Sequence, residues 1–515
     1  MRKAEQNGGK MNKSVSRKSL IGFAISGAVI VAVGFVAAQS GVADSYENKL
    51  TPLAARNVLA GQTATVMVKL KEQADLSRAV VRDGTPRADR IRAVYDVLRA
   101  KALETQGPLV ELLTSKGFKF RRFYISNMIT VYEATPVLVQ ELAARADVGK
   151  IYGNPVVAMQ TPFVDYSKSR TTIGDNIIFS GADKVWDEFK TKGEGIVVAG
   201  QDTGVAWEHF ALKKQYRGFD GQKADHSYNW HDSISIPISK EKTNKCGYNT
   251  AVPCDDDEHG THTMGTMVGD DGGENVVGMA PGSKWMACRN MDSGNGTPSS
   301  YIECFEYFLA PFPHGADPLT AGDPSKAPHV INNSWGCPPS EGCTGDEILP
   351  SLHAMKQAGI MVVVSAGNEG SGCSTIQNPP AYHTGVVLSV GAYNHRTGVI
   401  ASFSSRGPSS FDGGIGPNIV APGVNIRSTL PSGGYNGGGW SGTSMAGPHV
   451  AGAVALIWAA RPELEGRIAE TISLLTSTAT PKTADNQSCG GVPGTQVPNN
   501  TYGHGIMNVY AALKK

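Results

Sequence analysis

Short apolar runs recur through residues 166–515, separated by polar stretches and by segments with helical spacing. The apolar runs lie at residues 196–200, 285–291, 330–333, 360–366 and 386–390. Runs this short and this uniformly hydrophobic are typical of parallel strands covered on both faces. Helical spacing, which would supply the crossover connections, occurs at residues 260–269, 299–309 and 347–358. The pattern therefore predicts an α/β fold with a doubly wound, mainly parallel sheet, whose functional groups gather at the carboxyl ends of the strands.

The pattern before residue 160 predicts a smaller unit, in which strands and helices alternate. Residues 62–70 alternate as a strand, and residues 87–116 have the spacing of a helix. Further strands are expected at about 119–133 and 151–158, on either side of a helix at 135–146. An order of strand, helix, two-strand region, helix and strand predicts a small ferredoxin-like α+β unit.

The first 43 residues have the pattern of an export signal. Basic residues dominate residues 1–19, and residues 20–38 form an uncharged apolar run. Small residues at Val36-Ala37-Ala38 and Gly41-Val42-Ala43 offer two cleavage sites, so we predict a secretory signal peptide. The apolar run also approaches the length of a membrane span, which keeps an uncleaved anchor as the alternative. Either interpretation places the protein outside the cytoplasm, as a secreted, periplasmic or membrane-anchored chain that meets a membrane only through this segment.

Charge is unevenly distributed along the chain. The formal net charge is only +1, which argues against a nucleic-acid binder. It divides into +5 on residues 1–43, +5 on residues 44–160 and −9 on residues 161–515. Because a basic N-terminal part and an acidic remainder attract each other, an intramolecular partner is expected.

The eight cysteines all lie between residues 246 and 489, and none forms a Cys-x-x-Cys motif. An even number spread through loops favours disulfides formed in an oxidising compartment over a metal site. Short separations favour the pairs Cys246 with Cys254 and Cys337 with Cys343.

A candidate nucleophile lies in residues 439–450, where Ser444 opens an apolar segment with helical spacing. We expect Ser444 at the start of a buried helix, with the positive helix end close to any oxyanion formed beside it. Pro448 fits a place in the first turn, where the helical amides have no partners to lose. The alternative is that Ser444 is only the N-cap of the helix. The choice depends on whether a base, an acid and an oxyanion donor occur elsewhere.

Candidates for all three groups are present. Asp202 ends an apolar strand, where a partly buried carboxylate can orient an imidazole. His259 stands just ahead of a helix, where its ring can take the serine proton through one nitrogen. The alternative for His259 is a metal pair with His262, although the chain has no His-Glu-x-x-His pattern. Asn368 follows another apolar strand, where its amide can donate to an oxyanion or serve only as a turn residue.

Several of these segments resemble the motifs of the subtilase family, the subtilisin-like serine proteases. They are Asp202-Thr203-Gly204, His259-Gly260-Thr261-His262, the segment around Asn368, and Gly442-Thr443-Ser444-Met445-Ala446 followed by Pro448 and His449. The chain order Asp, His, Ser differs from that of α/β-hydrolases and of chymotrypsin-like enzymes, which disfavours a lipase or an esterase. Residues 220–258 and 285–304 are similar to the bacillopeptidase F-like branch of the family.

The resemblance implies a catalytic role for each motif. Ser444 would be the nucleophile, His259 the general base, and Asp202 the residue that orients His259. Asn368 would form the oxyanion hole together with the backbone amide of Ser444, and His262 would be a structural histidine.

The resemblance also implies where a polypeptide substrate binds. The backbone of Ser334, Trp335 and Gly336 would pair with the extended substrate as an added strand. Gly367 and residues 371–380 would line the pocket for its primary side chain.

The resemblance further implies a division of the chain after the signal. Residues 44–165 would be a propeptide, an intramolecular chaperone and inhibitor, which the enzyme removes by cleavage in the loop at 159–170. The charge partition favours this interpretation over the alternative, an unrelated binding domain. Residues 166–515 would form the subtilisin-like catalytic domain.

Two acidic segments bear on ions and on the base. Residues 255–258 abut His259, and we expect them to form a solvated acidic loop. The alternatives are that they raise the pKa of His259 or hold a cation. Residues 270–276 occupy a loop that wraps calcium in many subtilases, but Gly272 stands where an asparagine is expected. The sequence therefore does not decide whether this domain binds a structural calcium ion. The chemistry implied by the resemblance requires no cofactor.

Together these features predict a secreted serine endopeptidase that works through an acyl-enzyme and is made as an autoprocessed preproenzyme. Its expected partners are polypeptide substrates and its own propeptide. The alternative is a secreted, non-catalytic binding or scaffold protein on the same fold, which the loss of a catalytic residue would have favoured.

Overall fold

The computed structural model describes residues 48–79, 84–164, 173–239 and 244–515. The predicted signal peptide or anchor at residues 1–43 lies outside these ranges. Within them, we find no helix that is both long and apolar enough to cross a membrane.

An eight-stranded sheet forms the centre of the larger part of the chain. Its strands lie in the order β15-β14-β13-β12-β7-β9-β8, with β16 beside β14, and all pairs except β14 with β15 are parallel. They are β7 Val197–Asp202, β8 Trp230–Asp232, β9 Lys284–Arg289, β12 Val330–Asn333, β13 Met361–Ser365, β14 Leu388–Asn394, β15 Val399–Ile400 and β16 Ile419–Pro422. The mainly parallel sheet predicted from the apolar runs is confirmed.

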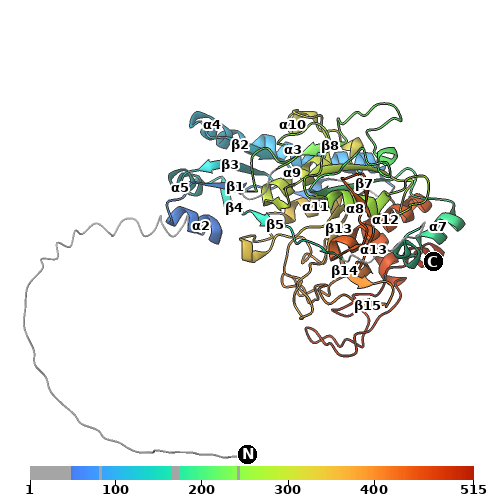
Figure 1. Ribbon diagram of the computed structural model, residues 1–515. Helices are drawn as coiled ribbons and strands as arrows, with labels where there is room; N and C mark the ends of the chain where they lie inside the picture. Colours follow the sequence, from blue (N-terminus) through green and yellow to red (C-terminus); the bar gives the residue numbers. More distant parts are fainter. Residues whose placement is uncertain (1–47, 80–83, 165–172, 240–243) are drawn as a thin grey trace, which may run out of the picture. The chain divides into compact units, whose positions relative to one another are not determined.

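Helices pack on both faces of this sheet (Figure 1). They include α8 His259–Val268, α9 Pro298–Leu309, α11 Leu349–Ala358 and α12 Thr443–Ala460. Val330 of β12 lies in the core that contains α8 and α12, whereas its neighbour Ile331 lies in the core that contains α9 and α11. Successive side chains point to opposite faces, so strands covered on both sides are apolar at every position.

Helix α12 carries Ser444 and is buried from Thr443 to Trp458. Because the helix begins at Thr443, Pro448 is its sixth residue and does not lie in the first turn, so the predicted position was wrong. A proline lacks the amide that would bond to the carbonyl four residues earlier, here that of Ser444. The hydroxyl of Ser334 donates to this carbonyl instead, at 3.1 Å, and so makes the proline tolerable.

Residues 48–79 and 84–164, here called the N-terminal sheet region, contain a separate antiparallel sheet in the order β2-β3-β1-β4. Its elements are α2 Pro52–Leu59, β1 Ala64–Leu70, α3 Arg87–Thr105, α4 Gly107–Ser115, β2 Phe120–Phe123, β3 Met128–Ala134, α5 Pro136–Ala144 and β4 Val148–Gly153. One face of this sheet packs on α4 and α5 in its own buried core.

The N-terminal sheet region shares a second core with the larger sheet. Val94 and Leu98 of α3 belong to the same buried cluster as Phe305 of α9 and Leu352 of α11. The helices α3 and α11 contact each other directly. The contact between the two regions is therefore apolar and continuous with the core of the larger sheet.

Four disulfides join all eight cysteines. They are Cys246–Cys254, Cys288–Cys304, Cys337–Cys343 and Cys373–Cys489. The two short-range pairs predicted from the sequence are confirmed. The remaining helices and short strands are α6 Asp175–Ser180, α7 Ala182–Phe189, α10 Pro318–Ala321, α13 Ile468–Ser477, α14 Val509–Lys514, β5 Val157–Ala158, β6 Phe163–Val164, β10 Met291–Asp292, β11 Asn295–Gly296, β17 Thr429–Leu430, β18 Gly434–Tyr435 and β19 Trp440–Ser441.

Candidate active site

The candidate acid, Asp202, is the last residue of β7 and is buried. Its Oδ1 accepts hydrogen bonds from His259 Nδ1 at 2.8 Å and from the backbone amide of Thr203 at 2.7 Å. The hydroxyl of Thr263 donates to Oδ2 at 3.3 Å. A parallel strand that ends here delivers its last side chain to the edge of the sheet, where α8 begins.

The candidate base, His259, is the first residue of α8 and is fully buried. Burial lowers the pKa of the imidazole, but the charge and hydrogen bond of Asp202, helped by the charges of Asp257 and Asp255, outweigh it and raise the pKa. The bond to Asp202 places the proton of the neutral ring on Nδ1. Within the described residues, His259 Nε2 is buried without a hydrogen-bond partner, and it is free to accept a proton.

The candidate nucleophile, Ser444, is the second residue of α12 and is 6% exposed. Its hydroxyl donates to the backbone carbonyl of Ser334 at 3.2 Å. The structure thus joins Asp202 to His259, but it holds the Ser444 hydroxyl on Ser334. Such contacts between nucleophile and base often form only in the substrate complex.

Asn368 lies beyond the end of β13 with its amide in a fixed orientation. Its Oδ1 accepts from the backbone amide and from the hydroxyl of Thr443, both at 2.9 Å. With the oxygen occupied by two donors, Nδ2 is the atom left to donate toward Ser444, which lines the same pocket. Sequence reasoning missed Thr443 as the orienting residue, although it stands beside Ser444 in the quoted motif.

A pocket of about 110 Å³ opens beside Ser444. Its lining includes all four predicted substrate-binding residues, Ser334, Trp335, Gly336 and Gly367, together with Asn368 and Asn378. The Trp335 ring stacks on Tyr301, with ring centroids 3.9 Å apart, and so forms a rigid wall.

Residues 157–164 of the N-terminal sheet region run through this site. Strand β5 pairs with β11, and the amide of Met159 continues the pairing by donating to Gly294 at 2.8 Å. The Gln160 side chain lines the pocket and donates to Glu369 Oε1 at 2.7 Å. On the other side, β6 pairs with β19, just before α12. Glu369 could not be recognised as a contact from the sequence, because Gln160 lies 209 residues away from it.

The second histidine of the motif, His262, does not approach a metal-binding arrangement. Its Nε2 bonds to the backbone carbonyl of Ile426 at 3.1 Å, and its ring stacks on Trp440. Burial, reinforced by the nearby His259, lowers the pKa of His262 to about 3. The ring is therefore a neutral, structural histidine.

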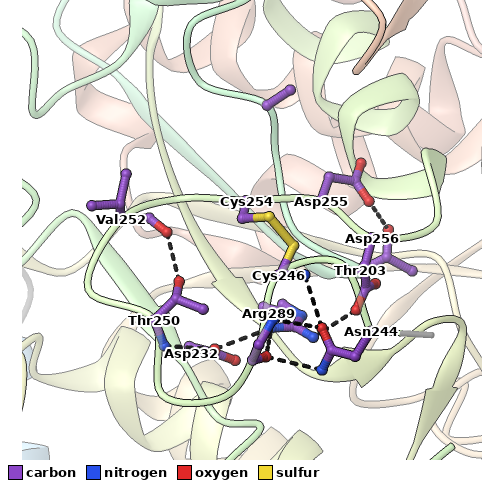
Figure 2. The surroundings of a disulfide bond; sticks show 12 residues. Thr203, Asp232, Asn244, Cys246, Thr250, Val252, Cys254, Asp255, Asp256 and Arg289 are labelled. Carbon is purple, nitrogen blue, oxygen red and sulfur yellow. Dashed lines mark hydrogen bonds and ion pairs between the residues drawn. A yellow bond between two sulfur atoms is a disulfide. The ribbon is translucent and has the colours of Figure 1, made fainter.

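The acidic segment before His259 is partly buried, contrary to the solvated loop that the sequence favoured. Asp256 is 7% exposed and meets the buried guanidinium of Arg289 at 2.6 Å, and Asp232 binds the same guanidinium at 3.1 Å (Figure 2). Burial raises the pKa of Asp256 to about 6. Glu258 is exposed, so the solvated interpretation holds only for that end. The acidic run in the sequence does not reveal that its cation, Arg289, lies on the separate strand β9.

At residues 270–276 the sequence puts calcium in doubt, because Gly272 stands where an asparagine is expected. Asp271 accepts from the backbone and side-chain amides of Asn275, at 3.0 and 2.6 Å. The guanidinium of Arg427 donates to Asn275 Oδ1 at 2.6 Å. In this structure the polar groups of the loop are therefore satisfied by one another and by an arginine.

An acid–imidazole pair, a serine at the start of a buried helix and an oriented amide around one pocket are the elements of a triad serine hydrolase. The profile of the Subtilase family matches residues 193–505, and the chain belongs to this family.

Individual members of the family extend the likeness. The chain is 32% identical to Bacillopeptidase F of Bacillus subtilis (strain 168) over 506 residues, 92% of this chain and 33% of that protein. It is 36% identical to Subtilisin E of the same strain over 265 residues, 50% of this chain and 57% of that protein. It is also 36% identical to Subtilisin of Bacillus pumilus over 264 residues, 50% of this chain and 78% of that protein. The chain thus spans about a third of Bacillopeptidase F.

Proposed function

We propose that this chain is a secreted serine endopeptidase, made as a precursor that cuts itself. The observation that carries the proposal is the 2.8 Å bond from His259 to Asp202 beside a pocket shared by Ser444, Asn368 and the segment around Gln160. The site thus combines a polarised base, a candidate nucleophile and an extended polypeptide.

The geometry suggests how the residues would act. Ser444 Oγ turns from the carbonyl of Ser334 to His259 Nε2, loses its proton there and attacks the peptide carbonyl. Asp202 holds the other ring nitrogen and stabilises the imidazolium that forms. The imidazolium then gives its proton to the leaving amine, and a water repeats the cycle to release the acyl group.

The developing oxyanion would be held by two donors. The backbone amide of Ser444 lies in the first turn of α12, where no carbonyl of the helix can accept it. Asn368 Nδ2 is the second donor, because Thr443 fixes its oxygen. In subtilisin, a relative, such a side-chain donor stabilises the transition state by about 3 kcal/mol.

We infer that the predicted propeptide, residues 44–165, ends a few residues earlier than its predicted boundary, at Gln160, and that the first substrate is this chain itself. Strand β5 and Met159 pair with the segment around β11, and β6 pairs with β19, which immediately precedes α12. The stretch between these two pairings, residues 160–162, therefore crosses the region of the pocket that Ser444 lines. The Gln160 side chain lies at the pocket, which makes Gln160–Thr161 the bond expected to break. It falls within the loop predicted from the sequence. Export from the cytoplasm is supported by the four disulfides, which require an oxidising compartment.

The test compares the full chain with Ser444→Ala. The unchanged chain should hydrolyse casein and yield a mature protein with a new N-terminus at Thr161, read by N-terminal sequencing. Ser444→Ala should do neither and should accumulate as the uncut precursor. Hydrolysis of casein by purified Ser444→Ala would refute the proposal.

A further inference from the structure

Asp255, four residues before His259, has an unusually dense set of hydrogen bonds. Its Oδ1 accepts from Thr203 Oγ1 at 2.8 Å and from the amides of Asp257 and Glu258 at 3.1 and 3.0 Å. Its Oδ2 accepts from the amide and the hydroxyl of Thr261, at 2.8 and 2.5 Å. All five partners are donors and favour the anion, and they oppose the burial that raises the pKa of the Asp255 carboxyl.

These bonds join the strand end that carries the acid to the helix start that carries the base. Thr203 follows Asp202 and donates its amide to Asp202 Oδ1. The hydroxyl of Thr203 in turn accepts from the amide of Gly260, at 2.9 Å. Thr261 lies in the first turn of α8, two residues after His259. Asp255 therefore bonds to both elements at once, to Thr203 at the strand end and to Thr261 at the helix start.

Asp255 also acts where the helix lacks its own cap. The residue before α8, Glu258, has a left-handed backbone and makes no side-chain cap bond. Asp255 takes over this role from four residues upstream, because it satisfies amides at the helix start. Its charge lies at the positive end of the helix, where an anion is favourable.

A brace keeps Asp255 in place. The preceding residue, Cys254, is tied to Cys246, and the following residue, Asp256, is tied to the buried Arg289 (Figure 2). Arg289 lies on β9, in register with Asp202 on β7. The loop that carries Asp255 is thus anchored to the strand beside the one that carries the acid.

We propose that Asp255 is a positioning residue for the reaction, which fixes the His259 imidazole against Asp202 through Thr203 and the first turn of α8. The inference rests on the proposed function of the site. Its charge acts as well, since Asp255 and Asp257 both favour the protonated ring. The other titratable groups that bear on His259 are Asp202, which favours the same form, and the neutral His262.

Three variants separate position from charge. Asp255→Asn removes the charge and the acceptor for Thr261. Asp257→Asn removes a neighbouring charge but keeps the anchor. Asp255→Glu keeps the charge but displaces the anchor by one methylene group. The measurements are kcat and KM for a peptide substrate from pH 5 to 9, and the rate at which the full chain cuts itself.

Asp255→Asn should lose about 10- to 100-fold in plateau kcat with KM unchanged, since a small misplacement of a reacting group costs this much. Its acid limb should move to lower pH, because a lost neighbouring anion lowers the pKa of His259. Asp257→Asn should show the shifted limb with the plateau intact. Asp255→Glu should show the reverse, a lowered plateau with the limb in place.

A wild-type plateau and limb in Asp255→Asn would overturn the proposal, as would an equal loss of plateau kcat in Asp257→Asn. If Asp255→Asn does not fold, a wild-type plateau in Asp255→Glu would overturn it. Failure of the proposed function itself is distinguishable, because then the unchanged chain would hydrolyse nothing and the Ser444→Ala chain would look the same.

Discussion

Buried carboxylates occur on two sides of the larger sheet, and their partners differ in origin. Beside the active site, Asp232 and Asp256 bind Arg289, which belongs to the same part of the chain. On α9, Glu303 binds Arg121, and Glu306 accepts the amides of Tyr124 and Ile125 at 2.6 and 3.1 Å. All three of these partners belong to the N-terminal sheet region.

The difference concerns permanence. If the N-terminal sheet region is a propeptide, Glu306 loses both amide partners when it leaves and Glu303 keeps only His231, whereas the acids beside His259 keep theirs. Glu306 is fully buried while its partners are present, and this burial raises its pKa from 4.5 to about 8. We call the site around Arg289 the built-in site, because all of its members belong to the larger part of the chain. We call the site on α9 the borrowed site, because it depends on residues of the N-terminal sheet region.

The largest effect is expected from breaking the built-in site. Arg289→Met leaves Asp232 and Asp256 buried without their cation, which should lower the free energy of unfolding by about 3–5 kcal/mol. The measurement is urea unfolding in the Ser444→Ala background, where self-digestion is prevented. Arg396→Met, at an exposed ion pair, is the matched control and should cost no more than about 1 kcal/mol. Equal losses in the two variants would contradict the prediction.

A pH-dependent effect is expected from the borrowed site. The raised pKa of Glu306 means that its stabilising contribution is complete below about pH 4.5 and is lost as the pH rises toward about 8. The free energy of unfolding should therefore fall across this window by up to about 1.4 kcal/mol per pH unit through this group. Glu306→Gln, which resembles the protonated acid, should flatten this fall in urea unfolding of the Ser444→Ala chain. Parallel pH profiles for the two chains would show that Glu306 is not the group responsible.

The smallest effect is expected from loosening a built-in contact of the oxyanion donor. Thr443→Val removes one of the two bonds that orient Asn368, so kcat should fall about fivefold with KM kept, a cost of about 1 kcal/mol. Thr443→Ser keeps the hydroxyl and should retain most of the activity. Steady-state kinetics on one peptide would compare them, and an equal loss in both variants would point to the lost methyl group instead.

Local pattern was sufficient to predict much of the fold and the candidate site. The apolar runs gave the parallel strands, since a strand covered on both faces has no polar positions. Asp202, His259 and Ser444 were found from short motifs, and the structure brings the first two into contact. The surroundings of these residues were beyond reach, because they depend on distant partners. Arg289 lies 57 residues from Asp232 in the sequence. The sequence alone therefore does not show whether Arg289, Asp232 and Asp256 form a buried ion-pair cluster or are separate charges on the surface.

Pro448 shows the same limit at closer range. The sequence alone suggested that Pro448 lies in the first turn of a helix. In the structure it lies in the second turn, and the Ser444 carbonyl accepts from the Ser334 hydroxyl in place of a helical amide. The Ser444 carbonyl and the Ser334 hydroxyl that donates to it are 110 residues apart in the sequence. Only the assembled sheet reveals which group replaces the missing amide.

The proline also affects when a working nucleophile comes into being. The turn of α12 around Ser444 cannot be completed from within, since its missing bond is supplied by a residue at the end of β12. In a newly made chain whose sheet has not yet formed, the backbone around Ser444 therefore lacks this bond and is not yet held in its final conformation. If the chain cuts peptides as proposed, a chain whose fold is unfinished would not cut, because the turn that carries Ser444 depends on a bond that only the assembled sheet supplies.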